Sequence, residues 1–301
     1  MSERITVIGL GAIGFGIASN LLKGGHQVFV TVHRSKDNVD RLVQLGARLC
    51  KSKSEAVEVS DIVILCLPTS DDVSNTITEI WAVLNDQHLV LDTGTSSVGA
   101  TLELAQRLTE RSVLFAEAPL AGGKAQSDAG ELGAFVGADD EVLDRVEPIL
   151  NNFCSSILHF GPIGSGGQAK LISNYLVLGM VRSIIETFHA ADVLGIDWEK
   201  FYRIICRGSG NSVALDRIIG QIVNDHDYGG YVFSVQNALK DSRYIEQVIR
   251  QAGLESSMSD SALKLFENAT AAGLGDRMIS ELLGEDLRTG LTAMLNRGDS
   301  R

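Results

Sequence analysis

Near the start of the chain, three glycines stand at the spacing G-x-G-x-x-G: Gly9, Leu10, Gly11, Ala12, Ile13 and Gly14. The β-branched run Ile5–Ile8 precedes them and a helical pattern follows, so the glycines fall in a strand–helix turn. There the first glycine allows a tight bend, the second admits a pyrophosphate, and the third lets helix and strand pack closely. Free N–H groups at the helix start bind phosphate oxygens. We therefore predict a dinucleotide site; a glycine-rich turn without a ligand is the alternative.

The residues after the second predicted strand indicate which dinucleotide binds. In an NAD site this strand usually ends in Asp or Glu, whose carboxylate takes the ribose 2′-hydroxyl. Here Val28–Val32 is followed by His33, Arg34, Ser35 and Lys36, none of them acidic. The planar guanidinium of Arg34 suits a phosphate, and Ser35 adds a hydroxyl donor. We therefore expect NADP, with His33, Arg34 and Ser35 in the binding set; NAD is the alternative if these residues lie in solvent.

A second candidate site contains Lys170 and Asn174. They are four residues apart in a long helical pattern over residues 168–194, so they share one helix face. When hydride reduces a carbonyl group, the new alkoxide needs a proton, and an ammonium group stabilises the charge and donates that proton. In the reverse direction a neutral amine accepts the hydroxyl proton. The alternative is a surface lysine beside a packing or capping amide.

The elements that position these residues change in kind along the chain. From residue 4 to about 162, short apolar strands alternate with helical stretches, whereas helical patterns dominate from residue 168 onward. This predicts an α/β fold: a Rossmann-type parallel-sheet domain over residues 1–163, and an all-helical substrate and dimerisation domain over residues 164–301, with a long interdomain helix. The predicted strands are Ile5–Ile8, Val28–Val32, Asp61–Leu65, Leu89–Leu91, Val113–Phe115, Ala134–Val136 and Ser156–His159. The predicted helices cover 12–23, 36–46, 70–84, 98–111, 141–150, 168–194, 198–206, 212–222, 237–252, 258–272 and 277–294.

The composition of the chain argues against several kinds of binding partner. Lys and Arg number 26 and Asp and Glu 38, which gives a net charge of −12 and argues against nucleic-acid or anionic-membrane binding. The 6 His show no metal-ligand spacing, and the 4 Cys form no C-x-x-C pair, so we expect neither a metal site nor disulfides. No uncharged apolar run approaches about 18 residues, so we expect no membrane span, and because Ile5–Ile8 already has a strand pattern we expect no signal peptide. We expect a cytoplasmic protein with a small-molecule substrate.

Several segments, in order, make the chain resemble the β-hydroxyacid dehydrogenase family, which includes 3-hydroxyisobutyrate dehydrogenases, tartronate semialdehyde reductases and glyoxylate/succinic semialdehyde reductases. The resemblance also makes the chain 6-phosphogluconate dehydrogenase-like. The matching segments are Gly9–Gly14, Leu67-Pro68, Asp92–Ser97, Glu117–Gly123, Gly164–Gly166, Lys170–Asn174, Phe233 and Lys240-Asp241. They cover nearly the whole chain, and their spacing is more diagnostic than any one of them.

The resemblance implies roles for these residues. Lys170 would be the proton donor and acceptor, and Asn174 would orient Lys170 or the substrate oxygen. Leu67, Pro68 and Thr95 would border the cofactor, Lys240 would meet its nicotinamide end, and Phe233 would cover it. Lys240 stands seven residues after Phe233, so a helix that included both would place them on one side. The substrate would lie against Gly94, Ala121, Gly122, Gly123 and Lys124.

Four positions depart from the family pattern. Gly94 and Ala121 stand where the family has serine, Ser173 replaces the first Asn of a pair, and Glu117 replaces Asp. The first two changes remove hydroxyl donors from the substrate pocket and enlarge it. We therefore expect a bulkier or less polar substrate than 3-hydroxyisobutyrate.

Together these features predict an NADP-dependent oxidoreductase that moves hydride between nicotinamide and a β-hydroxy acid, semialdehyde or ketone. One alternative is an imine reductase: the missing serines favour it, and Lys170 argues against it. The other alternative is a cofactor-binding scaffold without turnover. Because family members associate through their helical domains, we expect a homodimer or homotetramer.

Overall fold

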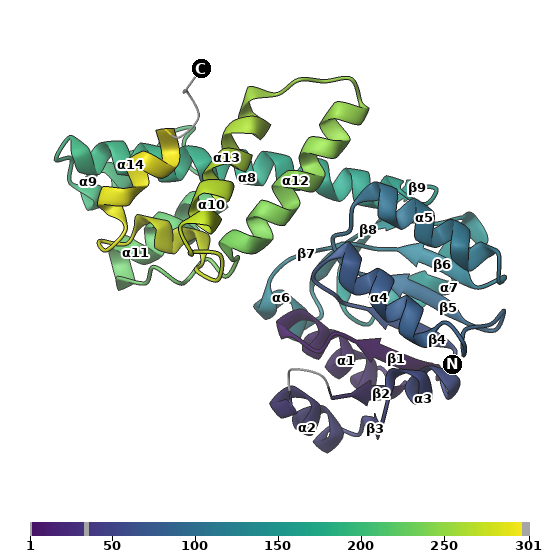
Figure 1. Cartoon of the computed structure of the whole chain (residues 1–301). Helices are drawn as coiled ribbons and strands as arrows, with labels where there is room; N and C mark the ends of the chain where they lie inside the picture. Colours follow the sequence, from purple (N-terminus) through teal and green to yellow (C-terminus); the bar gives the residue numbers. More distant parts are fainter. Residues whose placement is uncertain (1, 33–35, 297–301) are drawn as a thin grey trace. The chain divides into compact units, whose positions relative to one another are not determined.

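The computed structural model describes residues 2–32 and 36–296. The chain divides into two compact units, Met1–Lys170 and Leu171–Arg301. The predicted boundary after residue 163 precedes this division because the long helix α8 (Ser165–Val193) begins within the first unit. Figure 1 shows strands and helices alternating in the first unit, and helices in the second.

The first unit contains a sheet of nine strands, in the order β3-β2-β1-β4-β5-β6-β8-β7, with β9 paired to β8. Its strands are β1 (Arg4–Ile8), β2 (Gln27–Thr31), β3 (Arg48–Cys50), β4 (Ile62–Leu65), β5 (Leu89–Asp92), β6 (Leu114–Glu117), β7 (Leu120–Ala121), β8 (Leu132–Gly137) and β9 (Cys154–Gly161). The first six strands are parallel and reverse their order at β1, where Ile5 pairs with both Val28 and Ile62. This reversal is the point at which open α/β sheets bind ligands.

The predicted parallel sheet is confirmed for β1 to β6, and the structure adds antiparallel pairs beyond β6. β8 is antiparallel to both β6 and β7, while β9 runs parallel to β8, so the sheet is mixed. The cause is the short connection from β7 to β8, which contains only the helix α6 (Lys124–Ala129) and turns the chain back on itself. A parallel return requires a crossover that carries the chain to the opposite end of the sheet.

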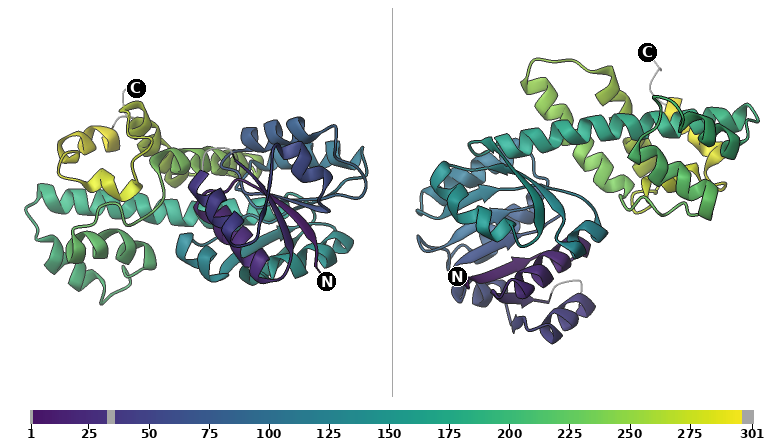
Figure 2. Two further views of the ribbon diagram at one scale, coloured as in Figure 1. Left: turned by 90° about the horizontal axis from the view of Figure 1, so that it is seen from below. Right: turned by 180° about the vertical axis from the view of Figure 1, so that it is seen from behind.

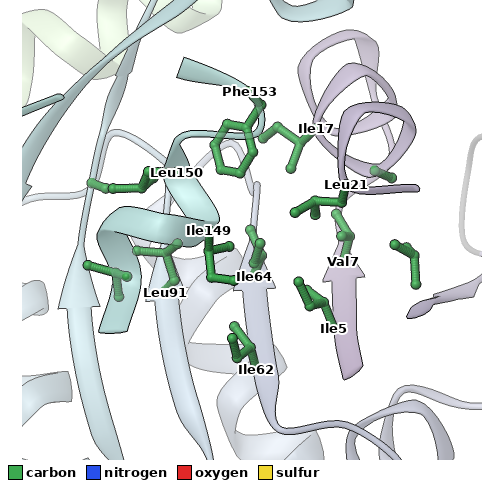
Figure 3. Close-up of a cluster of buried hydrophobic side chains, with 14 of the residues drawn as sticks. Ile5, Val7, Ile17, Leu21, Ile62, Ile64, Leu91, Ile149, Leu150 and Phe153 are labelled. Atoms are coloured by element: carbon green, nitrogen blue, oxygen red, sulfur yellow. The ribbon is translucent and has the colours of Figure 1, made fainter. Parts of the chain in front are cut away.

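Helices cover both faces of the sheet (Figure 1), and alternate strand residues form two cores, one of which is drawn in Figure 3. Besides α6, the helices of this unit before α8 are α1 (Ala12–Lys23), α2 (Lys36–Gln44), α3 (Lys53–Glu58), α4 (Ser70–Ile80), α5 (Val98–Thr109) and α7 (Asp140–Leu150). Ile5, Ile64 and Leu91 pack on one face against Leu21 of α1 and Ile149 of α7. On the other face, α3, α4 and α5 cover the intervening strand residues.

The second unit is helical. Its elements after α8 are α9 (Trp198–Ile205), α10 (Val213–Leu215), the π-helix η1 (Asp216–Gly220), α11 (Gln221–Asp225), α12 (Val235–Gln251), α13 (Ser257–Ala271), the 3-10 helix η2 (Ile279–Leu283) and α14 (Arg288–Asn296). The predicted single helix over 277–294 is wrong, because Gly284 adopts an extended conformation after η2 and interrupts it. In the predicted helix over 212–222, the middle turn is the π-helix.

Helix α8 is one continuous 29-residue element, drawn in teal in both views of Figure 2. Its length and its mean hydropathy of 1.2 over 18 residues would allow a membrane crossing. However, Arg182 forms an ion pair with Glu186 at 3.1 Å and also donates to Ser261, and Ile185 and Phe188 are fully buried. These contacts tie α8 to other side chains of the second unit.

Candidate functional site

The glycine turn after β1 has the close contacts that only glycine allows. Gly9 has a φ of +100°, and a Cβ there would lie 2.1 Å from the carbonyl oxygen of Cys66. A Cβ on Gly14 would lie 1.8 Å from the carbonyl oxygen of Gly9. A Cβ on Gly11, in contrast, would have no atom within 4 Å. Two glycines are therefore required by packing, and the third leaves open space above the turn.

The start of α1 offers backbone donors. Its N-cap, Gly11, has no side chain to accept them, and no acidic residue lies in the first turn of the helix. The loop is braced from outside, because Asn38 of α2 donates from Nδ2 to the carbonyl oxygen of Leu10 at 2.8 Å. Leu10 is buried, Ile13 half-buried and Ala12 exposed. Open space over the first N–H groups of a helix fits a dinucleotide pyrophosphate.

The ends of β4 and β5 lie beside this turn. Leu67, which follows β4, lies close to Gly9 of the turn and to Gly94, which follows β5. Its Cδ2 would be 3.2 Å from a Cβ on Gly9, and its carbonyl oxygen 2.7 Å from a Cβ on Gly94. Pro68 is exposed and Thr95 half-buried on the adjoining loops. The structure thus brings the predicted cofactor residues of the first unit together at the carboxyl ends of β1, β4 and β5. His33, Arg34 and Ser35 lie outside the described residues.

The predicted substrate loop is tied to the same region through α6. Ser127 of α6 donates from Oγ to the carbonyl oxygen of Ile13 at 2.8 Å, which docks α6 on α1. Gly122 has a φ of +122°, and Gly123 caps α6, donating its N–H to Gln126 Oε1 at 3.0 Å. Ala121 ends β7 and is half-buried. Lys124 is exposed and forms an ion pair with Asp128, so its charge already has a partner.

Lys170 is the last residue of the first unit. It is half-buried on α8, and its Nζ lies 5.8 Å from the centroid of the Phe135 ring, within cation–π range. The first turn of α8 lies against Glu117 at the carboxyl end of β6, since Gly164 donates its N–H to that side chain. The parallel strands β1 and β6 have their carboxyl ends on the same side of the sheet. The glycine turn follows β1 there, and the helix that carries Lys170 begins there beside β6.

Asn174 lies one turn further along α8, in the second unit, and is joined there to Lys240 by a carboxylate. Asn174 donates from Nδ2 to Asp241 Oδ2 at 2.8 Å, and Lys240 Nζ lies 3.1 Å from Asp241 Oδ1. Asp241 is 3% exposed. In the sequence, Asp241 is notable only as the neighbour of Lys240. The structure shows that its carboxylate joins Asn174 to Lys240.

Removing this bridge is expected to be costly. Asp241→Ala leaves the Lys240 ammonium without its carboxylate and the Asn174 amide without its acceptor, and should lower the free energy of unfolding by about 2–4 kcal/mol. The exposed pair Glu246–Arg250 on the same helix is a matched control, because Glu246→Ala should cost at most about 1 kcal/mol. Urea unfolding of both variants measures the difference; equal losses would contradict the structural role of Asp241.

Phe233 and Lys240 do not share one helix, so the condition for placing them on one helical side is not met. Helix α12 begins at Val235, and Ser234 caps it by accepting the N–H of Asn237. Phe233 therefore precedes the helix and is half-buried, and its carbonyl oxygen accepts the N–H of Ile279 at 2.9 Å. The serine cap was the signal in the sequence that places the helix start after Phe233.

The fold and the glycine turn define a dinucleotide-binding protein with a separate helical unit. Residues 4–161 match the family model for the NAD binding domain of 6-phosphogluconate dehydrogenase. Residues 164–284 match the model for the NAD-binding domain of NADP-dependent 3-hydroxyisobutyrate dehydrogenase. The chain belongs to the β-hydroxyacid dehydrogenase family, which confirms the resemblance, and it is an NAD(P)-dependent dehydrogenase of hydroxyl groups.

Individual relatives span almost the full chain. A 2-(hydroxymethyl)glutarate dehydrogenase of Eubacterium barkeri is 28% identical over 286 residues, covering 94% of each chain. A 3-hydroxyisobutyrate dehydrogenase structure from Mycobacterium tuberculosis, with L-serine, is 25% identical with a TM-score of 0.81, covering 94% of this chain and 98% of that one. An imine reductase structure from Pseudomonas sp. shares the fold at 20% identity and a TM-score of 0.62, covering 94% and 98%.

Proposed function

We propose that this protein is an NADP-dependent oxidoreductase that interconverts a β-hydroxy acid and the corresponding semialdehyde or ketone, with Lys170 moving the proton. The observation that carries this proposal is the position of Lys170. It lies in the unit that contains the glycine turn, on a helix whose first turn is bonded to the carboxyl end of β6. A bound nicotinamide cofactor would supply or accept the hydride.

The chain's own residues have distinct tasks in this reaction. The α1 N–H groups and Gly11 hold the pyrophosphate, and Leu67, Pro68 and Thr95 border the cofactor. The Lys170 ammonium stabilises the oxygen that gains charge during reduction and donates its proton there. Asn174 orients the substrate oxygen or the lysine. Asp241, by holding Asn174 and Lys240 together, keeps these two side chains in fixed positions.

The substrate we propose is larger than 3-hydroxyisobutyrate. Gly94 and Ala121 supply no hydroxyl, and a side chain on Gly94 would contact the carbonyl oxygen of Leu67 at 2.7 Å, so this position favours glycine. Each missing hydroxyl removes about 0.5–3 kcal/mol of hydrogen bonding to a small polar acid, depending on its charge. The relative named for 2-(hydroxymethyl)glutarate is consistent with a larger acid.

A substrate panel tests the proposal. NADPH absorbance would be followed with semialdehydes, keto acids of increasing size and cyclic imines. We expect turnover of a carbonyl acid larger than the 3-hydroxyisobutyrate aldehyde. An imine reductase is the second candidate, because the fold is shared and the pocket lacks two hydroxyls. Turnover of the imines alone would favour it, and tight NADPH binding with no turnover of any compound would favour a scaffold.

We predict that NADPH is preferred over NADH through Arg34. An arginine–phosphate bond to the ribose 2′-phosphate is worth about 1.5–3 kcal/mol, so kcat/KM should favour NADPH by at least about 10-fold. Arg34→Ala should lower kcat/KM for NADPH by a similar factor and leave the value for NADH almost unchanged, which makes NADH the internal control. A wild-type preference for NADH would defeat this prediction.

We also propose that the protein is a homodimer or homotetramer in the cytoplasm, associating through the helical unit. That unit exposes large apolar side chains at Val193, Leu194, Ile204, Val213 and Val232. Light scattering coupled to size exclusion would measure the mass, and a monomer would exclude the assembly.

A further inference from the structure

Glu117 ends β6 with its carboxyl group enclosed by backbone. The residue is 3% exposed, and its Oε1 accepts the N–H of Gly164 at 2.7 Å. The N–H groups of Gly166 and Gly167 also donate to this carboxyl group. Gly164 directly precedes α8, and Gly166 and Gly167 lie in its first turn, so a single side chain from the sheet holds the start of the helix.

The surrounding glycines make room for a glutamate. A Cβ on Gly137 would lie 2.4 Å from Glu117 Oε1, and a Cβ on Gly167 would lie 2.9 Å from Oε2. Gly166 is equally restricted, since its Cβ would lie 2.3 Å from the carbonyl oxygen of Phe135. Larger residues at any of these three positions would displace the carboxyl group or the helix. The enclosure is therefore fitted to this side chain.

The first N–H groups of a helix have no acceptor within the helix and need one from elsewhere. The first turn of α8 contains no acidic residue of its own. Glu117 supplies the acceptor from a different element, as an N-cap side chain does locally, and a negative charge there also complements the helix dipole. The position of the first turn of α8 thus depends on the Glu117 carboxyl group.

Lys170 is four residues after Gly166, one turn further along the same helix. Its Nζ lies over the ring of Phe135, the residue whose carbonyl oxygen lies against Gly166. A shift of the first turn would therefore move the lysine relative to the strand β8. We propose that Glu117 is a positioning residue for Lys170: by bonding the first turn of α8 to the end of β6, it fixes where the amine stands. The inference rests on the proposed role of Lys170.

Charge at this position depends on pH. The pKa of Glu117 is raised to about 7: burial is the main cause and the charge of Asp92 also raises it, while the three backbone N–H bonds lower it. Asp92, on the adjacent strand β5, is the charged side chain that acts on it, while β8 and α8 present Gly137 and the glycine N–H groups. The carboxylate holds the helix above this pH. Protonation below it weakens the three bonds, so Lys170 should lose its fixed position as the pH falls.

The test compares Glu117→Gln, Glu117→Asp and the control Ser52→Ala, which removes the N-cap of α3 in the same unit. A displacement of about 1 Å costs up to about 100-fold in rate, so Glu117→Gln should lower kcat by about 10–100-fold and leave the dissociation constant of NADPH within about twofold. The wild-type fall in kcat near pH 7 should disappear in Glu117→Gln. Glu117→Asp keeps an ionisable group and should restore a pH-dependent kcat. Ser52→Ala should keep the wild-type kcat and pH profile.

A substrate-free measurement separates this inference from the proposed function. Lysines would be labelled with an amine reagent at pH 6–8 and quantified by mass spectrometry, with exposed Lys51 as the internal reference. The Lys170/Lys51 labelling ratio should change by about threefold or more across pH 7 in the wild type and not in Glu117→Gln. A wild-type labelling profile in Glu117→Gln would overturn the positioning role even if Lys170→Ala is inactive. An active Lys170→Ala would instead overturn the proposed function, and the labelling result would still decide the role of Glu117.

Discussion

Lys170→Ala is expected to lower kcat by about 10²–10⁴-fold, the range that general acid–base groups contribute. The pyrophosphate contacts lie at the glycine turn, so the dissociation constant of NADPH should stay within about twofold of the wild type. Stopped-flow turnover with the best compound of the substrate panel would measure kcat, and quenching of protein fluorescence would measure cofactor binding.

Two further variants make this result specific. Lys170→Arg keeps the positive charge but holds its proton too tightly to transfer it, so it should recover cofactor binding and little turnover. Lys51→Ala removes an exposed lysine of the same unit and should behave as the wild type. If Lys170→Ala retained kcat, the lysine would have no part in proton transfer, and an imine reductase or another acid would have to be considered.

The sequence predicted the parts of the fold that repeat a simple pattern. Helix α1 was predicted with both ends correct, because the glycine turn marks its start and Gly24-Gly25 follow its end. The strands β4 and β5 were also predicted, since buried parallel strands are continuous apolar runs. The short elements β3 and α3 were missed, because three and six residues are too few to establish a period.

The sequence suggests candidate site residues one at a time, but not the contacts that join them. The spacing of Lys170 and Asn174 indicated a shared helix face, yet the bond from Asn174 to Asp241 joins residues 67 positions apart and has no local signal. Glu117 was noted as a departure from the family pattern, and its partners, the glycines at the start of α8, are 47 or more positions away. Contacts across such distances depend on tertiary packing, which residue spacing alone does not encode.

The second large effect is expected at the glycine turn, where two substitutions of the same kind should act by different means. Gly11→Ala adds a methyl group into open space at a φ of −69°, so the free protein should keep its melting temperature. If the pyrophosphate occupies that space, the methyl group displaces it, and the dissociation constant of NADPH should rise by about 10–100-fold, or about 1.4–2.7 kcal/mol.

Gly14→Ala should instead destabilise the unit itself, because its methyl group would lie 1.8 Å from the carbonyl oxygen of Gly9 and must push α1 away from β1. Overpacking of this kind costs about 1–3 kcal/mol or more, and the melting temperature should fall even without cofactor. Gly99→Ala is the control: it lies in α5 with nothing within 4 Å, and should leave both quantities unchanged or raise stability slightly. Calorimetry with and without NADPH measures both effects. Wild-type affinity in Gly11→Ala would mean that no phosphate approaches the turn, since the added methyl group has nothing else to displace.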